Sequence, residues 1–393
     1  MSIISSQKVL IFVFLMLPSK NIILDTPELF ILQLYYNSIQ KFSYYLESNG
    51  ESMVISPTFD ADFYLELANE RKSRIMYSYE THIPFNYATG SYELFRKAKC
   101  CLFYNSKFKN EGENRLFIRL IDNHEIELGY FRLKVISTPG HTSDSSCLFL
   151  SNTKTNQFFL FSGNTLLLKD VGRPVSDGNN NCEVLARDLF NSVSIKLFSL
   201  PDETILLPGS HAGVLLGKTI GEGKTSTILS EKTNNSLLKQ TKDEFIKSMM
   251  SSIFSLPPFC QKILENNKIG SFSFDQKLKE TFILLPIQNF LDSYKVCDSI
   301  LVDARKNVDF INSHIPNAVF LSMDAPGFEN WLGILYNNKK FAFICDKGRE
   351  NELAVRLLRA GNDGSVGMLE GGIEAWKEGT LCNYNFSFNI LYI

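Results

Sequence analysis

The spacing of apolar segments changes near residue 285, and this change constrains the fold more than any other feature of the chain. From Phe42 onward, short strand-like segments separated by turn residues predominate, namely CCLFYNS, NRLFIRLI, HEIELGYFRLKVIS, CLFLS and QFFLFSG. Such spacing is typical of a β-sandwich rather than of continuous βαβ alternation. Beyond residue 285, the apolar segments SILVDAR, AVFLSM, FAFIC and SVGML alternate with helical patterns. This second pattern predicts a parallel sheet that is covered on both faces.

The sequence therefore predicts two folded domains, which a length of 393 residues can accommodate. A sandwich domain is expected over residues 23–240, and a parallel α/β sheet domain over residues 286–380. Residues 241–285 contain a Pro-Pro break and a Ser/Asn/Lys-rich passage, which predicts a connector. Residues 381–393 are expected to form a C-terminal tail. Within the sandwich, FSYYLES and SMVISP flank an Asn-Gly turn, which predicts a β-hairpin.

Residues 1–22 form either a leader or an N-terminal extension. Lys8 precedes an apolar run over residues 9–17, which is too short to span a bilayer. The run lacks an A-x-A-like cleavage site and is followed by Lys20, so a signal peptide and a buried strand both remain open. Eight cysteines without a C-x-x-C pair favour a reducing compartment. We expect a cytoplasmic protein without a membrane span, which is mitochondrial or exported if residues 1–22 are a leader.

The charge and the histidine content limit the chemistry that the chain can perform. Forty Lys and Arg residues oppose 42 Asp and Glu residues, so the formal charge of −2 provides no field to recruit nucleic acid. The chain has only five histidines, so any imidazole-based metal site must use His82, His124, His141, His211 or His314.

Polar residues follow three of the predicted strands. Thr81-His82 comes after RIMYSYE, His141 follows FRLKVIS within Thr-Pro-Gly-His-Thr, and Asn164 follows QFFLF within Ser-Gly-Asn-Thr. A lone histidine at a strand end is most often a hydrogen-bonded structural residue. Three polar strand ends together instead indicate side chains that converge on one point.

Residues ~30–240 resemble the metallo-β-lactamase fold, and specifically its persulfide dioxygenase branch. The resemblance is carried by ETHIPFNYATG, STPGHTSDSS, FSGNTLLLKDVGRP and LPGSHAG, in the family's order and approximate spacing. It implies an αββα sandwich in which two histidines and one carboxylate hold a single Fe(II) and leave positions open for a thiolate and O₂. Carried over to this chain, the metal ligands would be His82, His141 and Asn164.

The chain departs from that family at the metal site. Asn164 offers a neutral amide oxygen where the family has an aspartate, so the resemblance implies a weakened or lost Fe(II) site. Pro84, Asn86 and Tyr87 stand at the remaining positions of the family's T-H-x-H-x-D-H motif. These replacements remove the second metal site that the hydrolytic relatives have.

Three positions around the expected site complete this comparison. Ser56 stands where an acidic residue is usual, and His211 is offset by one from the family's P-x-H-G-A-G. Arg173, in VGRP, is retained. It is expected to hold an anionic substrate or to brace its loop, with a surface ion pair as the structural alternative.

Residues ~285–380 resemble a rhodanese domain, through LVDAR, SHIPNAVFLSM, FICDKGRENELAVRLLRAG and LEGGIEAWKEG. The resemblance implies that Cys345 ends the central strand and carries sulfane sulfur. Lys347, Gly348 and Arg349 would line the loop that binds the anion. Nearby carboxylates disfavour a thiolate, so a strand-end core cysteine remains the alternative.

Together the two resemblances imply a protein of sulfide and glutathione-persulfide metabolism. It would oxidise persulfide sulfur to sulfite with Fe(II) and O₂, with impaired activity at the metal site, and would transfer sulfane sulfur. The expected ligand is glutathione persulfide or another low-molecular-weight persulfide, and a homo-oligomer is one open state of assembly. Two alternatives remain: a non-catalytic binding or scaffold protein that retains both folds, and a sulfurtransferase that acts through Cys345 only.

Overall fold

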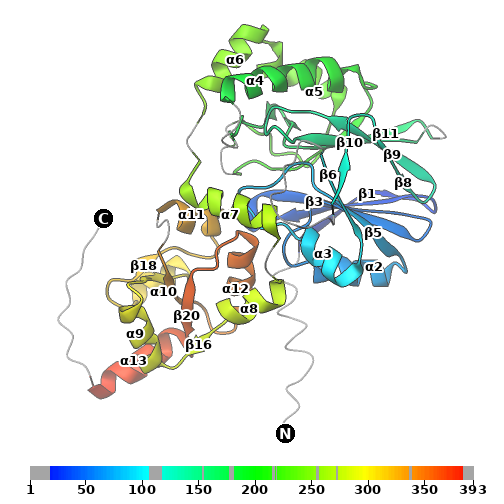
Figure 1. Ribbon diagram of the computed structural model, residues 1–393. Coiled ribbons are helices and arrows are strands. Elements are labelled where there is room, and N and C mark those ends of the chain that lie inside the picture. Colours follow the sequence, from blue (N-terminus) through cyan, green and yellow to red (C-terminus); the bar gives the residue numbers. More distant parts are fainter. Residues whose placement is uncertain are drawn as a thin grey trace. The chain divides into compact units, whose positions relative to one another are not determined.

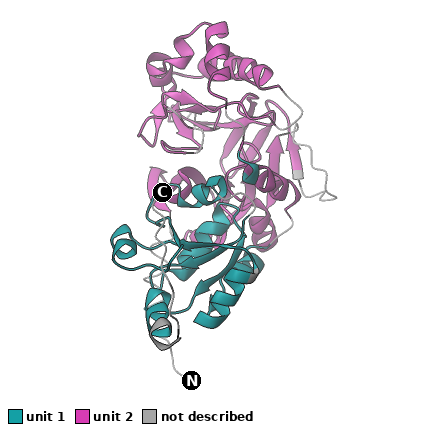
Figure 2. Cartoon of the chain, turned by 90° about the vertical axis from the view of Figure 1, so that its left-hand side faces the viewer, with its two compact units in different colours: residues 1–17, 257–259, 271–393 teal, residues 18–256, 260–270 magenta. Residues whose placement is uncertain are grey.

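The computed structural model describes residues 18–105, 117–152, 155–176, 181–214, 217, 219–253, 256–270, 273–335 and 339–383. The chain divides into two compact units (Figure 2). We call Pro18–Leu256 with Cys260–Gly270 the sandwich unit, and Pro257–Phe259 with Ser271–Ile393 the parallel-sheet unit. Most of the expected leader, residues 1–17, lies outside the described residues, and the strand β1 begins at Ser19.

The sandwich unit contains two main sheets. The first has seven strands in sequence order, antiparallel from β1 to β4 and parallel from β4 to β7. In the part of the chain that the structure describes, the second has six strands in the order β15-β14-β11-β10-β9-β8; β11 and β14 pair parallel and the other neighbours antiparallel. The strands of the first sheet are β1 (Ser19–Asp25), β2 (Phe30–Tyr36), β3 (Lys41–Ser48), β4 (Glu51–Ile55), β5 (Arg74–Tyr79), β6 (Cys101–Asn105) and β7 (Phe117–Leu120). Those of the second are β8 (Glu125–Leu128), β9 (Phe131–Ser137), β10 (Ser146–Asn152), β11 (Gln157–Gly163), β14 (Ile205–Pro208) and β15 (Ser226–Thr227), and β12 (Leu166–Leu167) pairs with β13 (Asp170–Val171).

Alternation of apolar and polar residues orients these strands. In β9, for example, Phe131, Leu133 and Val135 are buried, whereas Arg132 and Lys134 are exposed. The inner faces of the two sheets share one hydrophobic core. The outer face of the first sheet contacts α2 (Asp62–Glu70) and α3 (Ser91–Ala98), and a second core joins the other sheet to α4 (Cys182–Asn191) and α6 (Lys242–Met250) (Figure 1). The layers are therefore α, β, β and α, as predicted.

The predicted hairpin is present as β3 and β4, which pair antiparallel. Its two turn residues, Asn49 and Gly50, have φ angles of 51° and 75°. Left-handed φ angles at both central residues match the twist of the flanking strands, which explains the Asn-Gly sequence.

Among the described residues of the range 241–285, which was expected to be a connector, there are three helices and a short strand. These are α6, α7 (Pro258–Ile269), α8 (Phe274–Thr281) and β16 (Leu284–Leu285). A capping box between Thr241 and Glu244 begins α6, and Phe245 packs on Phe190 of α4. A short helix, α5 (Ile228–Asn234), follows β15 earlier in the sandwich unit.

The described residues of the parallel-sheet unit form five strands in the order β16-β20-β19-β17-β18, all parallel. Hydrophobic cores lie on both of its faces, as the unbroken apolar strands predicted. Its remaining elements are α9 (Ile287–Val296), β17 (Ile300–Asp303), α10 (Asn307–Asn312), β18 (Val319–Phe320), α11 (Phe328–Leu335), β19 (Phe341–Ile344), α12 (Glu350–Arg359), β20 (Ser365–Leu369) and α13 (Gly372–Asn383). Within the described ranges of the whole chain, no helix combines the length and apolar character needed to cross a bilayer.

Candidate functional site

Three strand ends of the sandwich unit bring the predicted ligand residues together. His82 follows β5 of the first sheet, whereas His141 and Asn164 follow β9 and β11 of the second. The imidazole ring centroids of His82 and His141 are 4.9 Å apart, at an interplanar angle of 81°. The amide Nδ2 of Asn164 lies 3.2 Å from Nε2 of His141. We call these three residues the histidine cluster.

Main-chain contacts hold the His82 segment against the second sheet. The backbone N–H of Ile83 donates to Oδ2 of Asp144 at 2.9 Å, and the N–H of Ser146 donates to the carbonyl of Thr81 at 2.8 Å. Gly163, at the end of β11, has a φ of 53°, and a Cβ there would lie 2.5 Å from Oγ1 of Thr81. Only glycine allows this approach, which brings the β11 end to the His82 segment.

Both imidazoles of the cluster are buried and neutral near pH 7. Burial lowers the pKa of His141 to about 4, and burial, with smaller effects of the neighbouring His141 and Lys41, lowers the pKa of His82 well below its usual range. Nδ1 of His141 donates to the carbonyl of Arg173 at 2.7 Å, because a carbonyl oxygen can only accept. Nε2 of His82 has no hydrogen-bond partner among the described residues.

The atoms of the cluster that could coordinate a metal do not suit tight binding of Fe(II). Oδ1 of Asn164 accepts a hydrogen bond from Oγ of Ser210 at 2.8 Å, and its Nδ2 faces His141. Across the described part of the chain, no group of three or more His, Cys, Asp or Glu side chains is arranged to hold a metal ion. Two imidazoles and an inward amide N–H lack the carboxylate that a two-histidine, one-carboxylate iron site requires.

Ser210, which sequence reasoning missed, contacts the cluster in place of the neighbouring His211. The ring of His211 instead lies 5.0 Å from that of Tyr35 and 5.7 Å from that of Phe42. Its Nε2 lies 2.9 Å from the carbonyl oxygen of Glu222, and its Nδ1 lies 3.2 Å from that of Ala212. The one-residue offset in Pro-Gly-Ser-His-Ala-Gly was the available signal, because a shift of one residue turns a side chain to the other side.

A buried lysine beside the cluster was also missed. Lys41 begins β3, is 4% exposed, and places Nζ 4.3 Å from the ring centroid of Tyr87. Its ammonium donates to the carbonyl of Ser56 and, at 3.3 Å, to that of Phe42. Burial lowers the pKa of Lys41 despite the nearby charge of Glu80.

Glu80 is the buried acidic counterpart of Lys41. Its Oε1 accepts hydrogen bonds from Thr89 and, at 2.7 Å, from Ser91. Burial raises the pKa of Glu80, and the charge of Lys41 opposes this rise. No residue spacing predicts that these two charges interact, because Lys41 begins β3 whereas Glu80 follows β5, and the two come near each other only in the folded sheet.

Arg173 braces the loop that follows β13. Its guanidinium donates to Asp170 at 2.8 and 3.2 Å and to the carbonyl of Val171 at 2.6 Å. Both members of this ion pair are buried, so it is not the surface ion pair that sequence reasoning had left open. The guanidinium would have to leave these partners to hold a substrate.

Cys345 lies at the end of β19, as the resemblance to a rhodanese domain implied. Burial raises the pKa of its thiol, and the carboxylates of Glu350 and Asp346 add to the rise while Arg349 opposes it. A thiol with a raised pKa is protonated near pH 7 and is a poor nucleophile.

The loop after Cys345 is only partly available to an anion. Lys347 is exposed, and Gly348 adopts a φ of 90°. The guanidinium of Arg349, however, is held by Asp324 at 2.9 Å and by Glu352 at 2.8 Å. These carboxylates compete with any anion for its charge.

We therefore predict that Cys345 reacts slowly with iodoacetamide at pH 7, and that its rate rises about tenfold per pH unit without reaching a plateau by roughly pH 9. Site-resolved mass spectrometry would measure the rate, with the exposed Cys101 as a fast internal control. Replacing Glu350 with Gln and Asp346 with Asn should speed the reaction several-fold. Equal rates for Cys345 and Cys101 at pH 7 would contradict this account.

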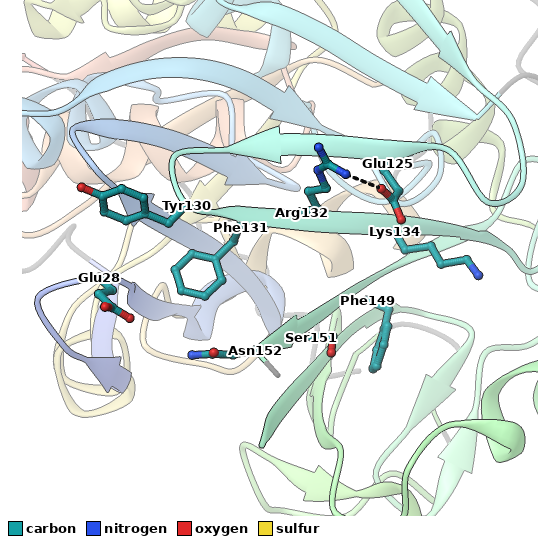
Figure 3. Close-up of a pocket in the computed structure, with 9 residues that line it drawn as sticks. All are labelled: Glu28, Glu125, Tyr130, Phe131, Arg132, Lys134, Phe149, Ser151 and Asn152. Carbon is teal, nitrogen blue, oxygen red and sulfur yellow. Dashed lines mark ion pairs between the residues drawn. The ribbon is translucent and has the colours of Figure 1, made fainter. Parts of the chain in front are cut away.

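A separate cavity of about 310 Å³ lies near the start of β9. Tyr130, Phe131 and Phe149 line it together with charged residues, of which Arg132 pairs with Glu125 at 3.6 Å (Figure 3). His141 follows the other end of β9, so this cavity is distinct from the histidine cluster.

Comparison with known proteins agrees with the two units. Residues 288–379 match the Rhodanese-like domain family. The mitochondrial persulfide dioxygenase ETHE1 of Homo sapiens is 28% identical over 211 residues, which cover 53% of this chain and 75% of that protein. A metallo-β-lactamase structure from Staphylococcus aureus subsp. aureus COL superposes with a TM-score of 0.76 at 24% identity, covering 88% of this chain and 99% of that one. The structure of ETHE1 from Myxococcus xanthus gives a TM-score of 0.52 at 23% identity, over 61% of this chain and 98% of that one.

The layered sandwich and these structural likenesses define a metallo-β-lactamase fold that is joined to a rhodanese domain. Both fold classes expected from the sequence are thereby confirmed. Within this class, the N-terminal half of the chain is similar in sequence to persulfide dioxygenases.

Proposed function

We propose that the chain acts in persulfide metabolism and that its sandwich unit takes a low-molecular-weight persulfide, such as glutathione persulfide, with O₂ as the second partner. The sequence similarity to persulfide dioxygenases supports the class of ligand. The observation that carries the proposal is the convergence of His82, His141 and Asn164 at the ends of three strands.

The proposal includes an impaired oxidation of persulfide sulfur to sulfite. Fe(II) is a hard cation and binds more strongly when a carboxylate offsets its charge. Asn164 supplies no negative charge, and Ser210 already engages its carbonyl oxygen. A single Fe(II) would therefore have only His82 and His141 as strong ligands.

Metal analysis with O₂ uptake tests this proposal. The purified wild-type chain should contain little iron and consume little O₂ when glutathione persulfide is added. Asn164→Asp should raise iron occupancy several-fold, because it restores a carboxylate between the histidines and Ser210. Full iron occupancy and rapid uptake in the wild type would contradict the impairment, and unchanged occupancy in the variant would show that another residue supplies the third ligand.

Sulfur transfer through Cys345 alone is the alternative that the rhodanese domain offers. The position of Cys345 at the end of the central strand favours it, whereas the raised pKa of the thiol disfavours it. Thiosulfate sulfurtransferase activity near pH 7 that Cys345→Ser abolishes would establish this alternative. Neither sulfur transfer nor O₂ uptake would leave a binding or scaffold protein.

A further inference from the structure

The hydrogen bonds of the histidine cluster form a connected series in which the donor and the acceptor of each bond are fixed. At one end, the carbonyl of Arg173 is an acceptor, so Nδ1 of His141 carries the proton. Nε2 of His141 lies against the amide Nδ2 of Asn164, a group that can only donate. Nε2 must therefore present its lone pair, and it requires a donor opposite it.

Asn164 supplies this donor and also accepts a hydrogen bond from the next residue in the series. Its Nδ2 donates to Nε2 of His141 at 3.2 Å, which leaves Oδ1 as the acceptor for the hydroxyl of Ser210 at 2.8 Å. Its backbone carbonyl accepts from the N–H of Gly172 at 2.9 Å, which fixes the main chain at this position. The side-chain nitrogens of His141 and the amide group of Asn164 therefore all have partners, a condition that buried polar groups nearly always satisfy.

An aspartate at position 164 would replace the favourable contact with His141 by an unfavourable one. Its carboxylate offers only lone pairs, and these would face the lone pair of His141. Two acceptors at about 3 Å repel each other unless a proton or a metal ion lies between them.

We propose that Asn164 takes the structural place of a metal ion, by donating its amide N–H to the lone pair of His141 that a metal would otherwise bind. The hydrogen bonds of His141 and Asn164 are then satisfied without a metal, whereas Nε2 of His82 has no hydrogen-bond partner in the ranges that the structure describes. This inference rests on the proposed function for its choice of site, but its test uses no persulfide, so the two can fail separately.

Thermal unfolding of the full-length chain tests the inference through metal dependence. The midpoint of the wild type should stay within about 1 °C when EDTA, equimolar Zn(II) or anaerobic Fe(II) is added, because a ligand that does not bind cannot stabilise. In EDTA, Asn164→Asp should unfold roughly 5–10 °C lower than the wild type, and Zn(II) or Fe(II) should recover most of the loss. Asn164→Ala is the matched control: it removes the donor without adding a carboxylate, so it should be destabilised but not recovered by metal.

A second measurement needs no variant. With only five histidines, the side-chain nitrogen spectrum of ¹⁵N-histidine-labelled protein is sparse enough to resolve His141. We expect the Nδ1–H tautomer, with an Nε2 signal that does not change when Zn(II) is added. Stoichiometric Zn(II) or Fe(II) binding by the wild type, seen as a changed His141 signal or a raised midpoint, would overturn the inference even if Asn164→Asp did not fold.

Discussion

Lys41→Met is expected to destabilise the sandwich unit by about 3–5 kcal/mol, because it removes the cation whose charge opposes the raised pKa of the buried Glu80 and takes the donor from the buried carbonyl of Phe42. Both residues are almost fully buried, at 4% and 1% exposure. The substitution also removes the donor from the carbonyl of Ser56, a residue held at a left-handed φ of 52°. Chemical denaturation of the full-length chain would measure the loss.

A double-mutant cycle separates charge from packing in this prediction. Lys41→Met with Glu80→Gln removes both charges, so it should cost clearly less than the sum of the two single variants. Lys232→Met is the matched control, because Lys232 pairs with Asp202 at 2.6 Å on the surface and should change stability by less than about 1 kcal/mol. Additive effects in the cycle would show that the two charges do not depend on each other.

Asn267→Ala should destabilise the sandwich unit by a comparable amount, about 3–5 kcal/mol, because three buried main-chain groups lose their partner. In α7, Nδ2 of Asn267 donates to the carbonyls of Pro84 and Tyr87 at 2.8 Å each. Oδ1 of Asn267 accepts from the N–H of Thr89 at 3.0 Å. These bonds hold the segment that carries His82.

Two measurements accompany this prediction. Urea denaturation gives the change in stability, and hydrogen exchange should show faster exchange at the Thr89 amide in the variant. Asn234→Ala in α5 is the control, because its exposed side chain makes only a 3.4 Å contact with Ser230 and its loss should cost less than about 0.5 kcal/mol. An unchanged stability for Asn267→Ala would mean that the segment holds its shape without α7.

The sequence predicted the histidine cluster because its members share a local rule. Each lies just after an apolar strand, and strand ends that reach one edge of a sandwich place their side chains together. The parallel-sheet unit was predictable for a similar reason, since its buried strands are unbroken apolar runs such as FAFI in β19.

Other parts of the site follow no local rule. Asn267 contacts Pro84 across 183 residues of sequence, within a passage whose polar composition indicated a connector. The burial of Lys41 and Glu80 arises only when separate strands assemble, and a lysine at a strand start otherwise indicates solvent exposure. The orientation of the Asn164 amide depends on the carbonyl of Arg173, which no spacing of side chains encodes.

The placement of the histidine cluster across both sheets has a mechanical consequence. His82 belongs to one half of the sandwich, and His141 and Asn164 belong to the other. A small molecule that contacts both imidazoles would therefore link the two sheets at one end, in addition to the core between them. Its binding would oppose separation of the two sheets and make the unit more rigid, whatever chemistry the bound molecule undergoes.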